Sequence, residues 1–200
     1  MHIYIVFAHP SKNSFTHKVL LSFCAGLAET HHTYEIGDLY ALNFKPDMDE
    51  EQYKREMDWD HPLAPVPEDV LEEQEKVNRA DGLVFIYPVW WSDCPAKLKG
   101  WFDRVWSYGF AYVYGESKER TSQVKPKKAL VICPAGHTVE LLNETGIAQS
   151  MRCIMLQDRL QNVGIREAHM EILGGMTEGG EEQARKNLAR AYELGKTFFK

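Results

Sequence analysis

Residues 84–106 read VFIYPVWWSDCPAKLKGWFDRVW, and this stretch guides the interpretation of the whole chain. It begins with a β-branched and aromatic run that ends at Pro88. It closes with a segment in which Leu98, Phe102 and Val105 recur at helical spacing. A strand, a loop and a helix in that order form the repeating unit of an α/β fold. Four of the five tryptophans fall inside it, so the loop is the first place to look for a ligand site.

The same unit recurs along the chain. Short apolar runs that predict strands occupy residues 3–8, 33–38, 83–88, 129–134 and, more weakly, 166–173. Amphipathic stretches that predict helices occupy residues 15–27, 70–77, 98–105, 143–163 and 181–199. Strands that are continuously apolar are buried on both faces. We therefore expect an α/β fold with a doubly wound, five-stranded parallel sheet and helices on both faces.

Composition is that of a water-soluble globular protein. The chain has 200 residues, of which 44% are hydrophobic and 26% charged, and we expect a single domain over residues 1–200. No apolar run approaches the roughly 20 residues that span a bilayer, and the start MHIYIVFAHP lacks a basic segment, so we expect a cytoplasmic protein without membrane insertion. The four cysteines form no CxxC pair, which favours reduced core thiols over disulfides or a metal site.

Charge is unevenly distributed. Residues 45–75 carry twelve acidic and three basic side chains, a local net charge of −9 in a chain whose total is −6. Such a surface repels nucleic acid but leaves room elsewhere for an anionic cofactor. The same region belongs to a long, proline-rich acidic loop that we expect over residues 39–67. Loops of this length in a compact domain are usually functional or interfacial.

Polar and aromatic residues follow three of the predicted strands, where parallel sheets gather their ligands. The first loop, HPSKNSFT, carries Ser11, Asn13 and Ser14 where a helix begins, so it could hold a phosphate in the field of the helix dipole. Ser14 or Asn13 could equally be an ordinary N-cap. The second loop offers Trp90 and Trp91, and the third offers Gly136, which lets a ligand approach the backbone.

A phosphate-binding loop, a flat aromatic wall and bare backbone amides together suit a flavin. Core packing is the alternative explanation for the tryptophans, and it fits Trp101 and Trp106, which lie at helical spacing. Trp90 and Trp91 precede the helix, and two adjacent tryptophans cannot both point into one core. We expect at least one of them to line a pocket.

The segments FAHPSKNSF, ADGLVFIYPVWW, PAKLKGWFDRVW and FAYVYG resemble the NAD(P)H:quinone oxidoreductase family of flavodoxin-like flavoproteins, over essentially the whole chain. The resemblance implies a flavodoxin-like fold, a homodimer with flavin at its interface, and two-electron reduction of a quinone or similar aromatic acceptor by NAD(P)H. It implies FAD as the cofactor, with FMN as the alternative. The residues matched to cofactor-binding positions are His9, Asn13, Phe15, Thr16, Pro88, Val89, Trp90, Trp91, Asp103 and Arg185, and the third loop adds Pro134, Ala135, Gly136 and His137.

The third loop departs from the family pattern. Members commonly read Thr-Thr-Gly-Gly where this chain has CPAG, and their tyrosine and histidine of charge relay fall near Leu141 and Ala148. His137 lies beside Gly136 and has an imidazole that can donate a hydrogen bond, so we predict that it and Trp91 act at the reacting end of the flavin. The alternative for His137 is a solvent-facing loop residue without a catalytic role.

Other functions share part of this evidence. A one-electron flavodoxin-type carrier would have the same fold but rarely needs the long excursion at residues 39–67. Some relatives of similar sequence are ancillary regulatory subunits of potassium-efflux systems. A phosphate hydrolase is disfavoured because no Cys-x5-Arg loop follows the first strand.

Overall fold

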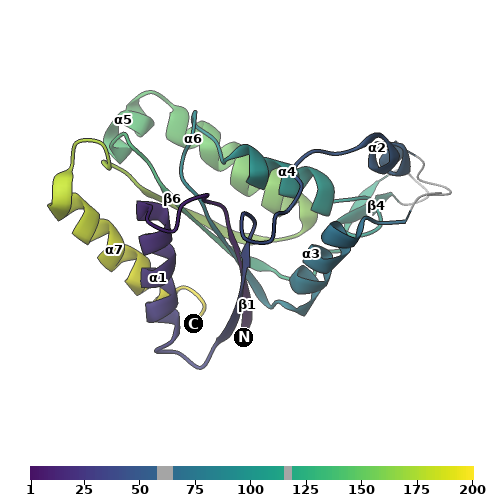
Figure 1. Ribbon diagram of the computed structural model, residues 1–200, viewed down its shortest axis with the longest axis horizontal. Helices are drawn as coiled ribbons and strands as arrows, with labels where there is room; N and C mark the ends of the chain where they lie inside the picture. The colour runs from purple at the N-terminus through teal and green to yellow at the C-terminus, as the bar shows by residue number, and fades with distance from the viewer. Residues whose placement is uncertain (58–64, 115–118) are drawn as a thin grey trace.

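A computed structural model describes residues 1–57, 65–114 and 119–200. Its main sheet has five parallel strands in the order β2-β1-β3-β6-β7 (Figure 1). The strands are β1 His2–Phe7, β2 Thr33–Asp38, β3 Gly82–Ile86, β6 Lys128–Pro134 and β7 Glu167–Leu173. All five predicted strands are confirmed within two residues, and so is the flavodoxin-like α/β fold.

Helices cover both faces of the sheet. One face carries α1 Phe15–Leu27 and α7 Gly180–Thr197. The other carries α3 Glu68–Arg79, α4 Ala96–Val105, α6 Ile147–Arg152 and the π-helix η1 Cys153–Leu160. Helices α1 and α7 run side by side (Figure 1), and their backbones come close because a Cβ atom at Gly26 or Gly195 would overlap the neighbouring helix backbone.

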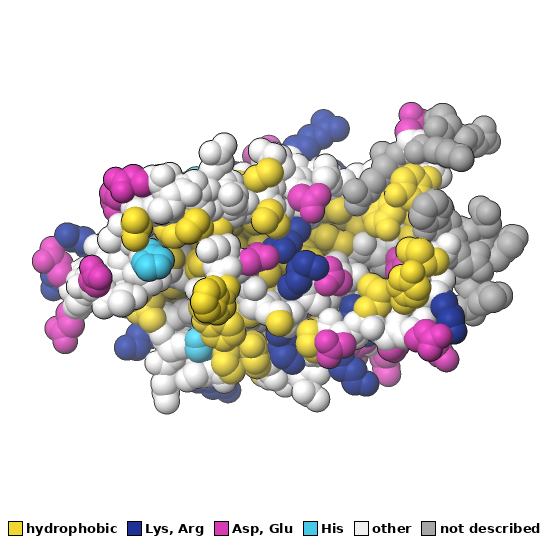
Figure 2. Space-filling model, turned by 90° about the horizontal axis from the view of Figure 1, so that it is seen from above, with side chains coloured by type: hydrophobic (Ala, Val, Ile, Leu, Met, Phe, Trp, Pro, Cys, Tyr) yellow, Lys and Arg dark blue, Asp and Glu magenta, His cyan; other side chains and the backbone are white. Residues whose placement is uncertain are grey.

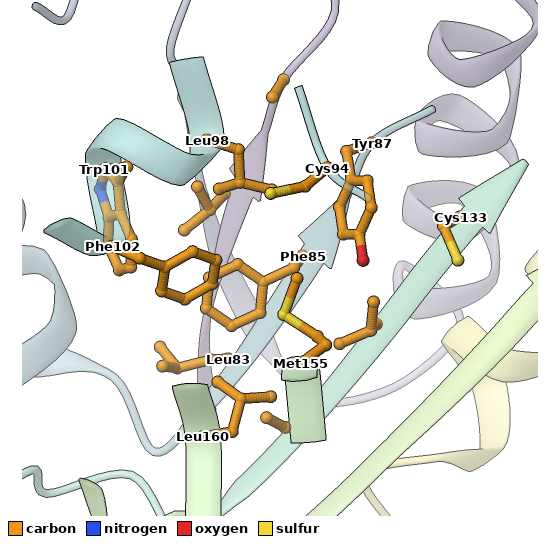
Figure 3. Packing of buried hydrophobic residues seen from close by; sticks show 14 of the residues in the cluster. Leu83, Phe85, Tyr87, Cys94, Leu98, Trp101, Phe102, Cys133, Met155 and Leu160 are labelled. Carbon is orange, nitrogen blue, oxygen red and sulfur yellow. The ribbon is translucent and has the colours of Figure 1, made fainter. Parts of the chain in front are cut away.

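The face under α4 holds the aromatic part of the core (Figure 3). Phe85 of β3 packs at ring-centroid distances of 5.2 Å from Phe102 and 5.7 Å from Trp101. Met155 and Leu160 of η1 close this layer. The core assignment of Trp101 is confirmed, since it is fully buried, and Trp106 is partly buried against the same cluster. Both ends of segment 84–106 are thus fixed by core packing, and the loop between them lies at the end of the strand.

The switch in winding direction occurs between β1 and β3. The chain leaves β1 through α1 on one face and leaves β3 through α4 on the opposite face. The loops that follow these neighbouring strands therefore diverge at the carboxyl edge of the sheet. In doubly wound folds this divergence opens the ligand crevice.

Residues 39–67 are not wholly irregular, contrary to expectation. They contain α2 Glu50–Met57, and residues 58–64 lie outside the described residues. The helix has a polar sequence, so it gave no apolar periodicity. It is held instead by buried polar contacts with α4: Arg104 donates to Gln52 Oε1 at 2.8 Å, and Gln52 Nε2 donates to the Arg104 backbone oxygen at 3.2 Å.

Two further differences concern the second half of the chain. The predicted helix over residues 143–163 is divided into α5 Val139–Glu144, α6, η1 and η2 Gln161–Val163. The first break falls at Gly146, whose φ of 74° ends α5 and redirects the chain. A short antiparallel pair, β4 Tyr112–Tyr114 with β5 Arg120–Ser122, was not predicted because each strand has only three residues.

The cysteines follow the prediction with one exception. All four are free thiols, and Cys24, Cys94 and Cys133 are buried. Burial raises the pKa of Cys94 and Cys133 to about 12, so both stay protonated at neutral pH. Cys153 is exposed, so its assignment to the core is wrong. In the described part of the chain, no helix is long and apolar enough to cross a bilayer.

Candidate flavin site at the carboxyl edge of the sheet

Three loops meet at the carboxyl edge of the sheet, and Figure 2 looks down on this edge. They follow β1, β3 and β6 and contain the predicted site residues except Asp103 and Arg185. Strands β1, β3 and β6 are consecutive neighbours in the sheet. The structure therefore brings together the three loops that the sequence singled out.

The first loop ends in an N-cap. Ser14 Oγ accepts a hydrogen bond from the His17 N–H at 3.1 Å, which confirms the capping interpretation for this residue. Ser11 and Asn13 are exposed, Phe15 is half-buried and Thr16 is buried. In the described chain the backbone N–H groups of Phe15 and Thr16 have no acceptor, as expected in the first turn of a helix. Capping thus leaves donors available for an anion at the same helix end.

His9 links the first loop to the second. Its Nδ1 accepts from the Ser11 N–H at 3.0 Å, and its ring lies edge-on to Trp90 with centroids 5.9 Å apart. Partial burial lowers the pKa of His9, although the backbone oxygen of Ser11 opposes this effect.

The second loop is a tight turn at residues 90–93. Backbone hydrogen bonds run both ways between Trp90 and Asp93, at 3.0 and 3.2 Å. The two central residues, Trp91 and Ser92, have φ of 49° and 64°, the pattern of a type I′ turn. Neither is Gly or Asn, so each position costs about 1–2 kcal/mol in backbone energy. Strain of this kind is typical of functional sites.

The two tryptophans of this turn are exposed in the described chain. The exposed fraction of Trp91 is 102% and that of Trp90 is 42%. Trp91 therefore packs against nothing in its own chain and is available to an external flat surface. Pro88 is buried and Val89 half-buried, and Val89 N–H donates to the Pro134 oxygen at 2.8 Å, which ties the second loop to the third.

An ion pair between the turn and η1 holds the turn in place, and the sequence analysis did not predict it. Arg159 of η1 donates to both carboxylate oxygens of Asp93, at 2.8 and 2.9 Å. Burial opposes ionisation of Asp93, but hydrogen bonds from Arg159 and the Cys94 N–H outweigh it and lower the pKa of Asp93. The partners are 66 residues apart, and no local pattern pairs them.

The third loop is held by the segment that follows β7. Four backbone hydrogen bonds of 2.8–3.1 Å connect residues 135–137 with residues 173–177. A Cβ atom at Gly136 would lie 2.6 Å from Thr177 Oγ1, so a larger residue here would displace the Thr177 hydroxyl.

His137 stands at the open side of the third loop. Its side chain is exposed, and in the described chain its imidazole makes no hydrogen bond or ion pair, while its backbone oxygen accepts from Gly175 N–H at 2.8 Å. Pro134 and Ala135 are buried under the loop, and Gly136 is exposed. The ring of His137 is thus free to meet a ligand or solvent.

Asp103 and Arg185 do not join the three loops in the same way. Asp103 lies on α4, two turns below the loop, and pairs with Lys99 at 2.5 Å. Arg185 lies on α7, one turn before Leu188, whose carbonyl accepts from Ser22 Oγ of α1. Their helices cover opposite faces of the sheet, so the two side chains do not meet within one chain.

The residues at this edge fit a flavin. In the described chain the backbone N–H groups of Phe15, Thr16, Trp91, Ser92, Gly136 and His137 have no protein acceptor. They come from all three loops and stand beside the exposed tryptophans. Donors at a helix end suit a phosphate, and donors in the other loops suit the polar edge of a flat heteroaromatic ring.

A separate cavity lies elsewhere. It has a volume of about 330 Å³ and is bounded by α5, β7 and α7, and none of the predicted site residues lines it. This cavity is therefore not part of the predicted site.

Comparison with known proteins agrees with this geometry. The model of the family described as flavodoxin-like fold matches residues 1–194. An NAD(P)H:quinone oxidoreductase from Methanothermobacter marburgensis is 54% identical, with a TM-score of 0.93 over 100% of this chain and 98% of that one. A mouse ribosyldihydronicotinamide dehydrogenase [quinone] is 29% identical over 99% of this chain and 92% of its own length.

Coverage is lower for another relative. A ribosyldihydronicotinamide dehydrogenase-like protein from Penicillium crustosum is 32% identical over 74% of this chain, and the match covers 62% of that protein. The family match, by contrast, includes all three loops and the whole sheet. The chain belongs to the flavodoxin-like family of NAD(P)H:quinone oxidoreductases.

Proposed function

We propose that this protein is a flavin-dependent oxidoreductase that passes two electrons, as a hydride, from NAD(P)H to a quinone or a similar small aromatic acceptor. The observation that carries the proposal is the set of backbone N–H groups without a partner in the described chain, which come from the same three loops that carry the exposed Trp90 and Trp91 at the carboxyl edge of the sheet. A bound flavin supplies the hydride chemistry itself.

The chain's own residues have three roles in this proposal. The N-terminus of α1 binds phosphate through the N–H groups of Phe15 and Thr16, with Ser11 and Asn13 exposed beside them. The turn at residues 90–93 offers Trp91 as an apolar surface for one ring face.

The third loop offers N–H donors, and the imidazole of His137, to the ring edge that gains negative charge on reduction. Such oriented donors stabilise developing charge without reorganisation. This role for His137 stays a proposal, since its exposure fits a solvent-facing residue as well.

We propose a homodimer with FAD as the cofactor. Asp103 and Arg185 lie on opposite faces, so both can contribute to the distal part of one FAD only if they come from different chains. A fully exposed Trp91 also favours a site completed by a second chain. FMN lacks the distal half of FAD, so it would need neither Asp103 nor Arg185, and it is the alternative.

Purification of the full chain tests these statements. The expected result is a yellow protein whose released nucleotide is FAD, whose mass by light scattering at micromolar concentration is that of a dimer, and whose flavin is bleached by NADH or NADPH and reoxidised by a quinone in one two-electron step. A protein that binds no flavin refutes the function. Slow reduction by both nicotinamides with fast one-electron exchange would favour a flavodoxin-type carrier. Co-purification with a membrane transporter would favour the regulatory alternative.

A further inference from the structure

We infer that Arg159 is a positioning residue for the turn at residues 90–93, and that its pairing with Asp93 fixes where the Trp91 ring and the free N–H groups of Trp91 and Ser92 stand. The inference rests on the proposed function, because it assigns this turn to the flavin. It adds a residue that lies outside all three loops.

Arg159 is itself held on several sides. Its side chain is 8% exposed, its guanidinium lies 5.4 Å from the Phe102 ring centroid, and Nη1 also approaches Cys94 Sγ at 3.4 Å. Its backbone oxygen accepts from Trp106 Nε1 at 2.8 Å. Both the main chain and the side chain are therefore fixed, and a planar guanidinium bound to both carboxylate oxygens leaves Asp93 little freedom to rotate.

The turn needs such an anchor because its own sequence does not favour its shape. Both central residues adopt left-handed φ although they are Trp and Ser, which lack the tolerance of Gly or Asn for this region. The backbone hydrogen bonds between Trp90 and Asp93 close the turn but do not fix its orientation relative to the rest of the chain. Cys94 is buried in the core beside Leu98 (Figure 3). Asp93 is the last residue of the turn and directly precedes the buried Cys94. Its pair with Arg159 therefore fixes the orientation of the turn relative to the core.

The pair also connects the second loop with an element outside the three loops. Arg159 belongs to η1, which follows the third loop through α5 and α6, whereas Asp93 belongs to the second loop. A π-helix is rare and frequently marks a functional position, and this one places Arg159 in its last turn. Loss of the pair should therefore release the turn at residues 90–93, which faces the proposed flavin, from η1.

Arg159→Lys is the direct test, because lysine keeps the charge but cannot bind both carboxylate oxygens in a planar fork. Apoprotein titrated with FAD and with FMN should bind its preferred flavin about tenfold more weakly than the parent. Arg104→Lys is the matched control: Arg104 forms an equally buried bidentate pair, with Asp69, away from the turn. It should lower thermal stability comparably and leave the flavin Kd within about twofold of the parental value.

A rescue separates positioning from general stability. Glycine is the favoured residue at the second central position of a type I′ turn, so Ser92→Gly should restore the turn without Arg159. We expect Arg159→Lys/Ser92→Gly to recover most of the lost flavin affinity. Should Arg159→Lys fail to fold, Asp93→Asn takes its place, since it retains an acceptor for the Cys94 N–H, bonded at 2.7 Å.

The outcomes are distinguishable. Parental protein that binds neither FAD nor FMN refutes the proposed function, and this inference with it. Parental binding together with an unchanged Kd in Arg159→Lys, or an equal loss of affinity in Arg104→Lys, overturns this inference alone.

Discussion

Truncation of Trp91 to alanine tests where the flavin lies. The exposed fraction of Trp91 is 102%, so the substitution removes no packing within the chain, and alanine occupies the same left-handed backbone position with similar strain. The free energy of unfolding should therefore change by less than about 0.5 kcal/mol. Any loss of flavin affinity can then be assigned to the missing contact.

The size of that loss follows from the area of the ring. An aromatic side chain buries about 150–250 Å² in full, and a flat ligand covers one face, or about 100 Å². At about 20 cal/mol per Å², the low end of the usual figure, this contact contributes about 2 kcal/mol, within a range of about 1–3 kcal/mol. We expect Trp91→Ala to weaken flavin binding about thirtyfold and Trp91→Phe to retain most of the affinity.

Fluorescence titration of apoprotein with FAD and FMN provides the measurement. Leu21→Ala is a suitable control, because Leu21 is 57% exposed on α1 and lies outside the three loops. Parental affinity and parental quenching of flavin fluorescence in Trp91→Ala would show that this ring does not face the flavin.

Three further predictions concern charge and hydrogen bonding. Arg104→Gln should lower the free energy of unfolding, measured in urea, by about 3 kcal/mol. This is near the low end of the cost of breaking a buried ion pair, because the Asp69 side chain is 34% exposed. The pKa of Asp93 is lower in the folded protein than in the unfolded chain, where it is about 4. The stability that this carboxylate contributes is therefore present above about pH 4 and is lost as pH falls through its pKa in the folded protein. Asp93→Asn should therefore flatten the decline of Tm in that acid range. If His137 donates to the reduced ring edge or to the acceptor, His137→Ala should slow flavin reduction by saturating NAD(P)H about tenfold to several hundredfold in stopped flow, whereas a parental rate across pH 6–8 would return it to a solvent-facing role.

The sheet could be predicted because its determinants are local. Each strand is a short apolar run, and β1 and β3 read as buried along almost their whole length. The first helix was equally readable, with Ser14 as its cap and an apolar stripe after it. Parallel topology then followed from burial on both faces.

Elements held by buried polar contacts could not be predicted in this way. Helix α2 has no apolar face, and Gln52 and Glu56 are its buried residues. Its stability depends on Arg104, 52 residues along the chain from Gln52. Such a pairing has no signature in a single sequence, because neither spacing nor periodicity connects the partners.

The position of the site could be predicted from the sequence, but the residues that hold its loops in place could not. The sequence indicated which loops follow β1, β3 and β6, since the carboxyl ends of parallel strands share one edge. It did not indicate that Arg159 anchors the second loop or that Thr177 packs on Gly136. These supports come from η1 and from the segment after β7, both distant in sequence.

The third loop shows how the same edge can persist with different chemistry. Leu141, near the position of the family's tyrosine, is an exposed residue of α5, and Ala148, near that of the histidine, is fully buried in α6. Neither side chain can move a proton. The loop backbone is nevertheless held by four hydrogen bonds from the segment after β7, so its N–H donors do not depend on the missing side chains. His137 is the titratable side chain that remains in this loop. Hydride transfer should therefore be preserved, while the pH dependence of flavin reduction should differ from that of relatives that keep the tyrosine and the histidine.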